Sequence, residues 1–170
     1  MKKADGALFN TAAVVTVDAR LVDKLKAQAR SAPSRRFRLC LHASTADQTQ
    51  EMIVVHCRDN YSRPHAHRSP LTYMIIEGRM RVLLFDDAGK VTQRIDLAAF
   101  SSGNAFALHI EPERWYMPVC LTEQVVFYET KWGPFRRETT NSWAPWSPAE
   151  HDAAAIAAYR RSLGVDFDET

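Results

Sequence analysis

Two apolar runs separated by a short link constrain the fold of this chain more than any other feature. Leu71–Ile76 and Arg79–Phe85 are both rich in residues that favour strands, and Gly78 lies between them. Glycine readily adopts the positive φ that a tight connection between strands needs. Residues 86–89, of sequence DDAG, then have the composition of a hairpin turn. The stretch therefore predicts consecutive β-strands joined by tight turns.

A pair of histidines, His65 and His67, precedes these strands. Pro64 fixes its own φ and favours extended backbone at Arg63. Alternate residues of an extended segment point to the same side, so we expect the two imidazoles to share one face. Two adjacent neutral imidazoles are a frequent beginning of a site for zinc, iron, copper or manganese. The pair is the first candidate metal-binding feature of the chain.

The rest of the chain repeats the pattern of short strands and turns. Short strands at this spacing are typical of an antiparallel sandwich or barrel. One helix is expected near residues 19–30 with Asp18 as its N-cap, and a second from the capping box SPAE at residues 147–150 to Gly164. Further strands are expected at residues 12–17, 34–42, 51–58, 91–97, 105–110, 115–121 and 124–131.

Composition limits the class of protein. The chain has 170 residues, which is most simply one domain, and its net charge of +2 is spread without the basic stripe of a nucleic-acid-binding protein. Cys40, Cys57 and Cys120 are expected to be small buried hydrophobes in a reducing compartment. The sequence offers no signal peptide or transmembrane span. We therefore expect a cytoplasmic protein with neither a membrane nor a nucleic-acid partner.

Several local motifs resemble one known group of proteins. The order His-x-His, strand, Gly78, strand and DDAGK looks like the first motif of the cupin superfamily. More narrowly, the chain resembles the WbuC family of cupin-fold proteins, which are found with bacterial surface-polysaccharide genes. The motifs that carry this resemblance, over roughly residues 18–160, are ARSAPSRR at 29–36, LH at 41–42, YSRPHAH at 61–67, ETKWGPF at 129–135 and WAPWSPAE at 143–150.

The resemblance implies an all-β fold, an antiparallel cupin (RmlC-like jelly-roll) barrel with a flanking helix at each end. Residues 18–170 would form this single domain, and residues 1–17 an N-terminal extension that carries a strand exchanged between the subunits of a homodimer. The resemblance also implies a metal held by the two histidines of the pair, a glutamate and a third histidine. Leu71 stands in the glutamate position and Tyr116 in that of the third histidine.

These two substitutions leave two readings of the site open. In one, His65 and His67 bind a divalent metal (zinc, iron, manganese or nickel) at low occupancy, helped by Tyr116, water or one of His42, His56 and His109. In the other, the site has lost its metal and the two histidines line a polar pocket. Leucine cannot bind a metal, and tyrosine binds one only as a phenolate, whose pKa is about 10 when free.

The residues expected around the pocket are Tyr116, His109, Arg63 and Leu71. Arg63 is either an anion clamp at the pocket mouth or a solvated loop residue, because its fork is suited to carboxylates and phosphates. Glu77, just before Gly78, is expected to point into solvent. No catalytic residue is assigned.

Three functions follow as hypotheses. The first is a pocket for a small molecule of sugar or nucleotide-sugar type, linked to surface-polysaccharide metabolism. The second is a metal-dependent enzyme of oxygenase or isomerase and epimerase type. A metal-free epimerase would need a histidine–carboxylate pair beside a tyrosine, and the sequence does not name the carboxylate. The third is a non-catalytic dimeric module with an inert pocket.

Overall fold

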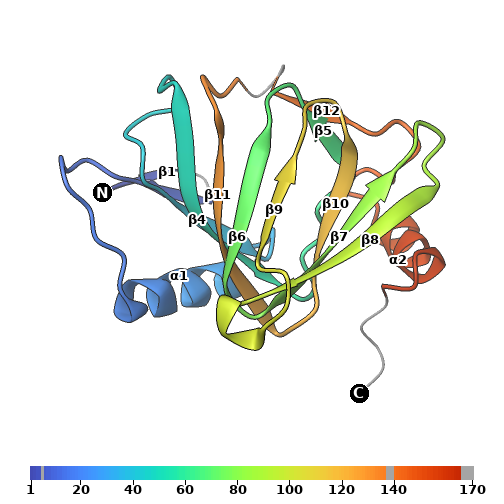
Figure 1. Ribbon diagram of the computed structural model, residues 1–170, viewed down its shortest axis with the longest axis horizontal. Coiled ribbons are helices and arrows are strands. Elements are labelled where there is room, and N and C mark those ends of the chain that lie inside the picture. The colour runs from blue at the N-terminus through green and yellow to red at the C-terminus, as the bar shows by residue number, and fades with distance from the viewer. Residues whose placement is uncertain (5, 137–139, 166–170) are drawn as a thin grey trace.

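The computed structural model describes residues 1–4, 6–136 and 140–165, and most of them lie in two β-sheets (Figure 1). The larger sheet contains β1 (Lys2–Ala4), β2 (Ala7–Phe9), β3 (Arg36–Cys40), β4 (Thr49–Cys57), β6 (Leu71–Glu77), β9 (Ala107–Ile110) and β11 (Gln124–Trp132). The smaller sheet contains β5 (His65–His67), β7 (Arg79–Phe85), β8 (Val91–Ala98), β10 (Trp115–Cys120) and β12 (Asn141–Trp143).

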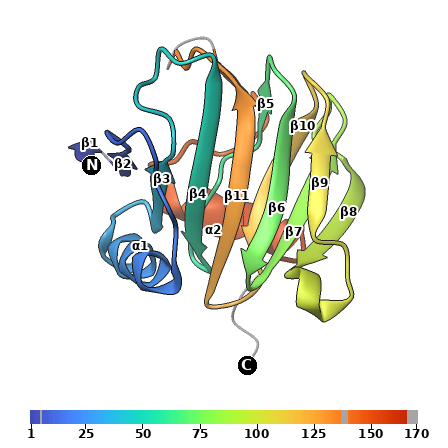
Figure 2. The ribbon, with the colours of Figure 1, turned by 60° about the vertical axis from the view of Figure 1, so that its left-hand side comes forward.

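The strands from β4 to β11 form a folded antiparallel ribbon. The first of them pairs with the last, β4 with β11, and the pairing continues inward through β5 with β10, β6 with β9 and β7 with β8. The ribbon is wrapped so that these pairs alternate between the sheets, in the orders β4-β11-β6-β9 and β5-β10-β7-β8. Figure 2 shows the larger sheet in front of the smaller one. Eight strands in this order form a jelly roll.

The interior of the jelly roll receives every second residue of each strand. On β11, Val125 and Phe127 point inward and pack in the main core, whereas Val126 and Tyr128 point outward. The same alternation carries Glu129 and Lys131 to the inner side. The sandwich is therefore apolar at one end and polar at the other, where the pocket lies.

Helix α1 (Ala19–Ser31) covers the outer face of the larger sheet beside β3 and β4. Asp18 caps it by accepting a hydrogen bond from the backbone N–H of Leu21 at 2.9 Å, as the sequence predicts. Its apolar stripe packs on the strands, with Val22, Leu25 and Ala29 buried.

Helix α2 (Ala153–Ser162) lies against the smaller sheet, and its start corrects a prediction. The expected capping box at residues 147–150 is wrong, because the helix begins five residues later, at Ala153, and Asp152 caps it by accepting from the N–H of Ala155. Ser147 does not cap the helix: its hydroxyl accepts from Nε of Arg63 at 3.0 Å and donates to the carbonyl of Ala144 at 2.7 Å. Trp146 packs against Phe85, which anchors the segment before the helix.

The N-terminal segment also differs from expectation. The expected strand at residues 12–17 is absent from the structure, and the segment instead forms the β1–β2 hairpin at residues 2–9. Strand β2 adds to the edge of the larger sheet by pairing in parallel with β3 of the same chain. The exchange of this segment between subunits stays a prediction.

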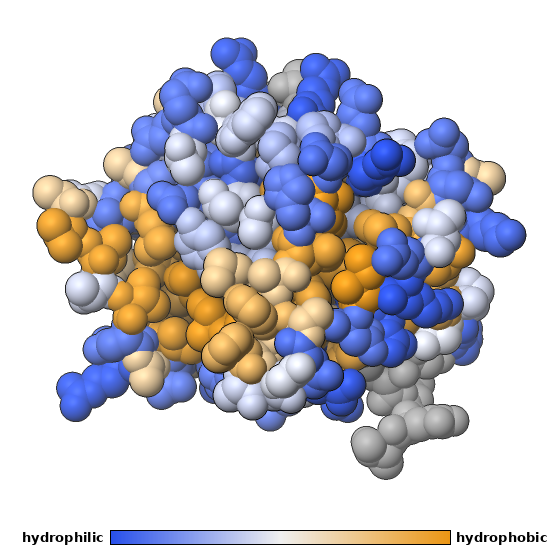
Figure 3. Space-filling model, in the orientation of Figure 1, coloured by the Kyte–Doolittle hydropathy of each residue, from blue (hydrophilic) through white to orange (hydrophobic). Residues whose placement is uncertain are grey.

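Part of the outer surface is apolar. Figure 3 shows hydrophobic side chains across the lower half of one face, where Figure 1 places β6 and the short 3-10 helix η1 (Phe100–Ser102). Met74 and Ile76 on β6, and Phe100 on η1, are exposed there. Neither helix of the described residues has the length and apolar character needed to span a membrane.

Gly78 is the one-residue link that takes the chain from β6 in one sheet to β7 in the other, and its φ is +80°. A Cβ at this position would lie 2.4 Å from the carbonyl oxygen of Gln124, which is backbone and does not move aside. Gly103 has a similar φ of +75°, but a Cβ there would meet nothing within 4 Å. A side chain at Gly103 would therefore introduce backbone strain alone, whereas one at Gly78 would introduce both strain and a steric clash.

We predict that Gly78→Ala destabilises the fold clearly more than Gly103→Ala. Gly103→Ala should lower the free energy of unfolding by about 1 kcal/mol, the cost of a left-handed alanine. Gly78→Ala should lose at least about 2 kcal/mol more, because the clash adds to the strain. Urea unfolding of both variants measures the difference, and equal losses would contradict the prediction.

Candidate functional site

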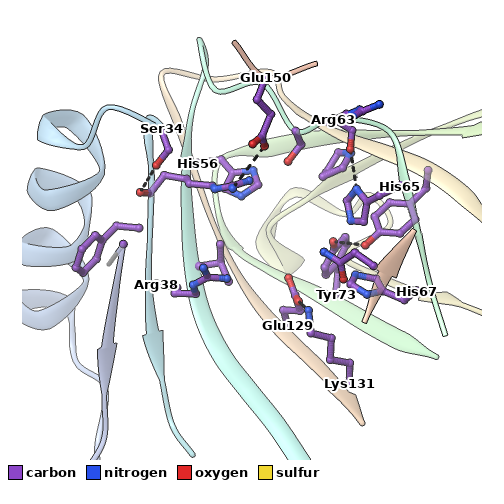
Figure 4. A pocket seen from close by; sticks show the side chains of 18 of the residues that line it. Ser34, Arg38, His56, Arg63, His65, His67, Tyr73, Glu129, Lys131 and Glu150 are labelled. Carbon is purple, nitrogen blue, oxygen red and sulfur yellow. Dashed lines mark hydrogen bonds and ion pairs between the residues drawn. The ribbon is translucent and has the colours of Figure 1, made fainter. Parts of the chain in front are cut away.

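A pocket of about 520 Å³ opens between the two sheets at the polar end of the jelly roll. Among the described residues, seven strands contribute to its lining (β3, β4, β5, β6, β10, β11 and β12), together with residues of the segments before β5 and after β11. Figure 4 shows Arg38 and His56 on one side, His65, His67 and Tyr73 on the other, and Glu129 with Lys131 between them. The pocket falls within the size range of small-molecule sites.

His65 and His67 both point into the pocket, as their alternation predicts. Their ring centroids are 5.1 Å apart, and the ring of Tyr116 lies 4.4 Å from that of His65. This contact follows from strand pairing, since Tyr116 on β10 is the register partner of His65 on β5. The structure thus brings together three of the residues that the sequence singled out.

Both imidazoles are neutral at pH 7. Burial lowers the pKa of His65 to about 4, and burial together with the Lys131 ammonium lowers the pKa of His67 to about 3. Nδ1 of His65 donates to the carbonyl of Arg63 at 2.8 Å, so its Nε2 carries the lone pair. His65 therefore offers an acceptor to the pocket, and neither ring carries a positive charge.

Two phenols lie next to the histidines. Tyr73 donates to the hydroxyl of Tyr116 at 3.4 Å, a long hydrogen bond. Both side chains are buried, and burial raises their pKa values well above 10. The two groups are therefore neutral hydroxyls, and Tyr116 retains its own proton to donate.

A buried ion pair forms the lower end of the pocket. Nζ of Lys131 lies 2.9 Å from Oε1 of Glu129, and the two side chains are only 8% and 12% exposed. Burial raises the pKa of Glu129, but the charge and hydrogen bond of Lys131, together with His67 and Arg38, outweigh it and bring the pKa to about 2. Glu129 is thus the carboxylate that the sequence analysis did not name. The signal was present in the alternation of β11, which places residue 129 in phase with Phe127.

The opposite wall is cationic. Arg36 and Arg38 on β3 point inward, and Arg36 is the register partner of His56 on β4. His56 is buried with its ring edge-on to Phe127, at 5.2 Å between centroids, and burial lowers its pKa to about 3. Arg36 lies 3.7 Å from Oε1 of Glu150 at the pocket mouth.

Arg63 lines the pocket, but residues of its own chain occupy its guanidinium. Nε donates to Oγ of Ser147 at 3.0 Å, and NH2 donates to the carbonyl of Ala144 at 3.1 Å. The guanidinium also lies 5.9 Å from the ring of Trp143. Arg63 therefore ties the segment after β12 to the mouth of the pocket, which is a positioning role.

Two residues expected in the pocket lie elsewhere. His109 is about half exposed, lies 3.0 Å from the hydroxyl of Thr72, and approaches Glu111 outside the pocket. Leu71 on β6 is buried among the apolar side chains of the main core and does not line the pocket. His42 does not line the pocket either, and Glu77 is half exposed and pairs with Lys26, as an outward carboxylate would.

The pocket residues do not fit a metal ion. Among the described residues, no group of three or more histidine, cysteine, aspartate or glutamate side chains is arranged to hold one. His65 and His67 are only two ligands, the carboxylate of Glu129 is bound to an ammonium, and Tyr116 is a neutral phenol. A cation bound at the histidine pair would also be repelled by the Lys131 ammonium, which already lowers the pKa of His67.

The arrangement of strands and pocket decides the fold. A jelly roll of eight strands with its polar site between the sheets is the architecture of cupins. The protein has the cupin fold. The prediction of an antiparallel cupin-type jelly roll with a flanking helix at each end is thereby confirmed.

Comparisons with known proteins extend the fold assignment but name no activity. No curated protein matches the sequence, and a family model described as a domain of unknown function (DUF6016) matches residues 17–97. A solved structure from Shewanella oneidensis has a TM-score of 0.53 at 7% identity, over 63% of this chain and 72% of that chain. A cupin superfamily protein from Desulfitobacterium hafniense has a TM-score of 0.46 at 13% identity, over 57% and 76%.

Similar structures also include part of a larger enzyme. A mutant of oxalate decarboxylase from Bacillus subtilis has a TM-score of 0.47 at 15% identity, and the match covers 57% of this chain. The matched region is only 24% of that chain. The identity and TM-score of this match are too low to carry over any function, so the chemistry has to be argued from the pocket itself.

The Glu129–Lys131 pair makes a direct prediction about stability. Glu129→Gln leaves the Lys131 ammonium buried without its carboxylate, so it should lower the free energy of unfolding by about 3 kcal/mol. The double variant Glu129→Gln with Lys131→Met removes both charges and should be more stable than Glu129→Gln alone. Urea unfolding of the two variants and of Lys131→Met completes the cycle. Additive losses would show that the pair is not coupled.

Proposed function

We propose that the protein is a WbuC-like cupin that binds a small hydroxyl-rich molecule, of sugar or nucleotide-sugar type, without a metal. One observation supports this above the others. Nδ1 of His67 and Oδ1 of Asn141 are buried polar atoms that make no hydrogen bond of normal geometry among the described residues, although the backbone of Thr140 approaches His67 and acts to raise its pKa. They belong to register partners on β5 and β12, and both residues line the pocket.

Unpartnered buried atoms are expensive and rare. Each costs about 1–3 kcal/mol, and most buried polar groups in native proteins have a partner. Two of them side by side in one pocket are explained by a ligand that supplies the missing partners. The ligand must both donate and accept, because the neighbouring groups include neutral imidazoles and phenols. Hydroxyl groups do both, which favours a sugar.

The aromatic rim supports the same class of ligand. Trp143 is 43% exposed at the pocket mouth, and its ring lies 5.6 Å from that of His65. An exposed indole beside polar groups offers an apolar face on which a sugar ring can pack while its hydroxyls reach the histidines. The link to surface-polysaccharide metabolism is part of the proposal and rests on the resemblance to the WbuC family.

The acid–base properties of the pocket favour binding over proton transfer. A general base works best when its pKa is near the working pH. His65, His67 and Glu129 have pKa values of about 4, 3 and 2, so all three are weak bases at neutral pH. Burial raises the pKa values of Tyr73 and Tyr116, so the two phenols are weak acids at neutral pH. The histidine–carboxylate–tyrosine set that an epimerase needs is present, but its proton affinities suit hydrogen bonding.

A ligand panel tests the proposal. Thermal unfolding in the presence of hexoses, N-acetylhexosamines, their 1-phosphates and nucleotide-sugars should show stabilisation by at least one member. Asn141→Leu removes an unpartnered acceptor, so it should raise the free energy of unfolding by about 1 kcal/mol while weakening the best ligand about tenfold. These opposite effects distinguish a binding atom from a structural one.

The matched control is Ser142→Ala, because Ser142 is the exposed neighbour on the same strand. It should change neither the unfolding free energy nor the affinity. Stabilisation by no member of the panel, or equal effects of the two substitutions, would refute the proposal.

The metal-dependent enzyme is the alternative, and elemental analysis separates the two. Protein purified without chelator should contain far less than one equivalent of zinc, iron, manganese or nickel per chain. Adding these metals should not shift thermal unfolding, since the pocket offers two imidazoles and a competing ammonium. A full equivalent of bound metal that is lost in His65→Ala would overturn the metal-free proposal.

A homodimer and a cytoplasmic location complete the proposal. The exposed Met74, Ile76 and Phe100 support the dimer, because apolar patches on monomers are usually small. Cys40, Cys57 and Cys120 are all free and buried, which is what a reducing compartment permits.

A further inference from the structure

Arg38 is a pocket cation that forms no ion pair among the described residues, and the carboxylate whose pKa it helps to lower, Glu129, is already paired with Lys131. It lines the pocket from β3, and Figure 4 shows its side chain on the wall opposite the histidines. Its guanidinium forms no hydrogen bond or ion pair within the described part of the chain. By contrast, Arg63 is held by Ser147 and Ala144, and Lys131 is held by Glu129. Arg38 is therefore free to contact a ligand.

The pocket as a whole carries excess positive charge. Of the lining residues that the structure describes, four are cations and two are carboxylates, which gives a net charge of +2. Glu129 is neutralised by Lys131, and Glu150 lies 3.7 Å from Arg36 at the mouth. Burial lowers the pKa of Arg36. The carboxylate of Glu150 opposes this shift, and the like charge of Arg38 adds to it. Uncompensated charge of this kind favours an anion in the pocket.

The spacing of the two arginines suits one group of atoms. Arg36 and Arg38 are two residues apart on one strand, so their side chains emerge on the same face about 7 Å apart along it. Two guanidinium forks at this distance can approach one tetrahedral anion from two sides, and forks match phosphate oxygens in geometry. A phosphate dianion would also balance the +2 net charge of the lining.

We propose that Arg38, with Arg36, forms an anion subsite that binds the phosphate of a phosphorylated sugar. The inference rests on the proposed function, because the sugar part of the ligand would lie against His65, His67 and Asn141 across the pocket. It narrows the ligand class from sugars in general to sugars that carry a phosphate. A neutral sugar would leave the cationic wall unsatisfied.

The test compares neutral and phosphorylated forms of the same sugars. Calorimetric titration of the wild type with a hexose, its 1-phosphate and inorganic phosphate should show the 1-phosphate binding at least about tenfold tighter than the hexose. Raising NaCl from about 0.05 M to about 0.5 M should reduce this advantage severalfold, since screening weakens the contact. This measurement needs no variant.

Variants then assign the effect to one residue. Arg38→Gln should reduce the advantage of the 1-phosphate to less than about threefold and leave the affinity for the neutral hexose unchanged. Arg38→Lys keeps the charge without the fork and should lie between the two. Arg20→Gln, an exposed arginine on α1, is the control and should behave like the wild type.

The outcomes separate this inference from the proposed function. Equal binding of the hexose and its 1-phosphate would overturn the anion subsite and leave sugar binding standing. Binding of inorganic phosphate that Arg38→Gln abolishes, with no gain from any sugar, would support the subsite and refute the sugar. An equal loss in Arg20→Gln would show a general charge effect and overturn the assignment, and binding of none of the probes would overturn both.

Discussion

The alternation of side chains along β11 is the constraint on which the rest of the structure depends. This strand lies between β4 and β6 in the larger sheet, so its inner face is the middle of the sandwich. Its inward residues change from Val125 and Phe127 to Glu129 and Lys131 within one strand. A period of two leaves no other place for these charges. The apolar core and the polar pocket thus lie at the two ends of the same inner face of the larger sheet.

Placing a carboxylate and an ammonium together has consequences for every neighbouring group. The pair satisfies each of its members, so neither requires a metal or a counter-ion from outside. The ammonium also disfavours a further positive charge nearby, which helps keep His67 neutral. A cupin pocket with two imidazoles and its own internal cation is therefore set up for hydrogen bonding, and the cationic wall on β3 is left as its unbalanced feature.

Much of the fold could be predicted because it depends on local pattern. The alternation of apolar residues predicted most of the strands, Gly78 and DDAG predicted the turns, and Asp18 predicted the start of α1. The start of α2 could not be predicted in this way. Ser147 had the right neighbours for a cap, but its hydroxyl is bonded to Arg63, which is distant in sequence, and to the nearby carbonyl of Ala144. The N-terminal strand was predicted at the wrong residues, because pairing at a sheet edge depends on the neighbouring strand, here β3, and not on local sequence alone.

The site was predicted less completely, since it is assembled from strands distant in sequence. His65, His67 and Tyr116 were expected together and lie together, because family resemblance supplied the register that spacing alone lacks. His109 was expected in the pocket from its place before Tyr116, but the phase of β9 turns it outward. Glu129, Lys131, Arg36 and Arg38 were overlooked in this role, although each strand pattern contained them, because charged residues are usually assigned to the solvent face.

The cost of this polar interior is itself an argument about function. Buried ion pairs and unpartnered polar atoms are often less stable than apolar residues of similar volume. The other end of the same sandwich shows that this sequence can build an apolar core, with Val82, Met80 and Leu97 fully or almost fully buried. A chain that maintains neutral imidazoles, buried phenols, an ion pair and the Arg38 guanidinium in one pocket forgoes the stability that an apolar core would give it there. Their worth is realised only when a molecule with complementary hydroxyls and charge fills the pocket.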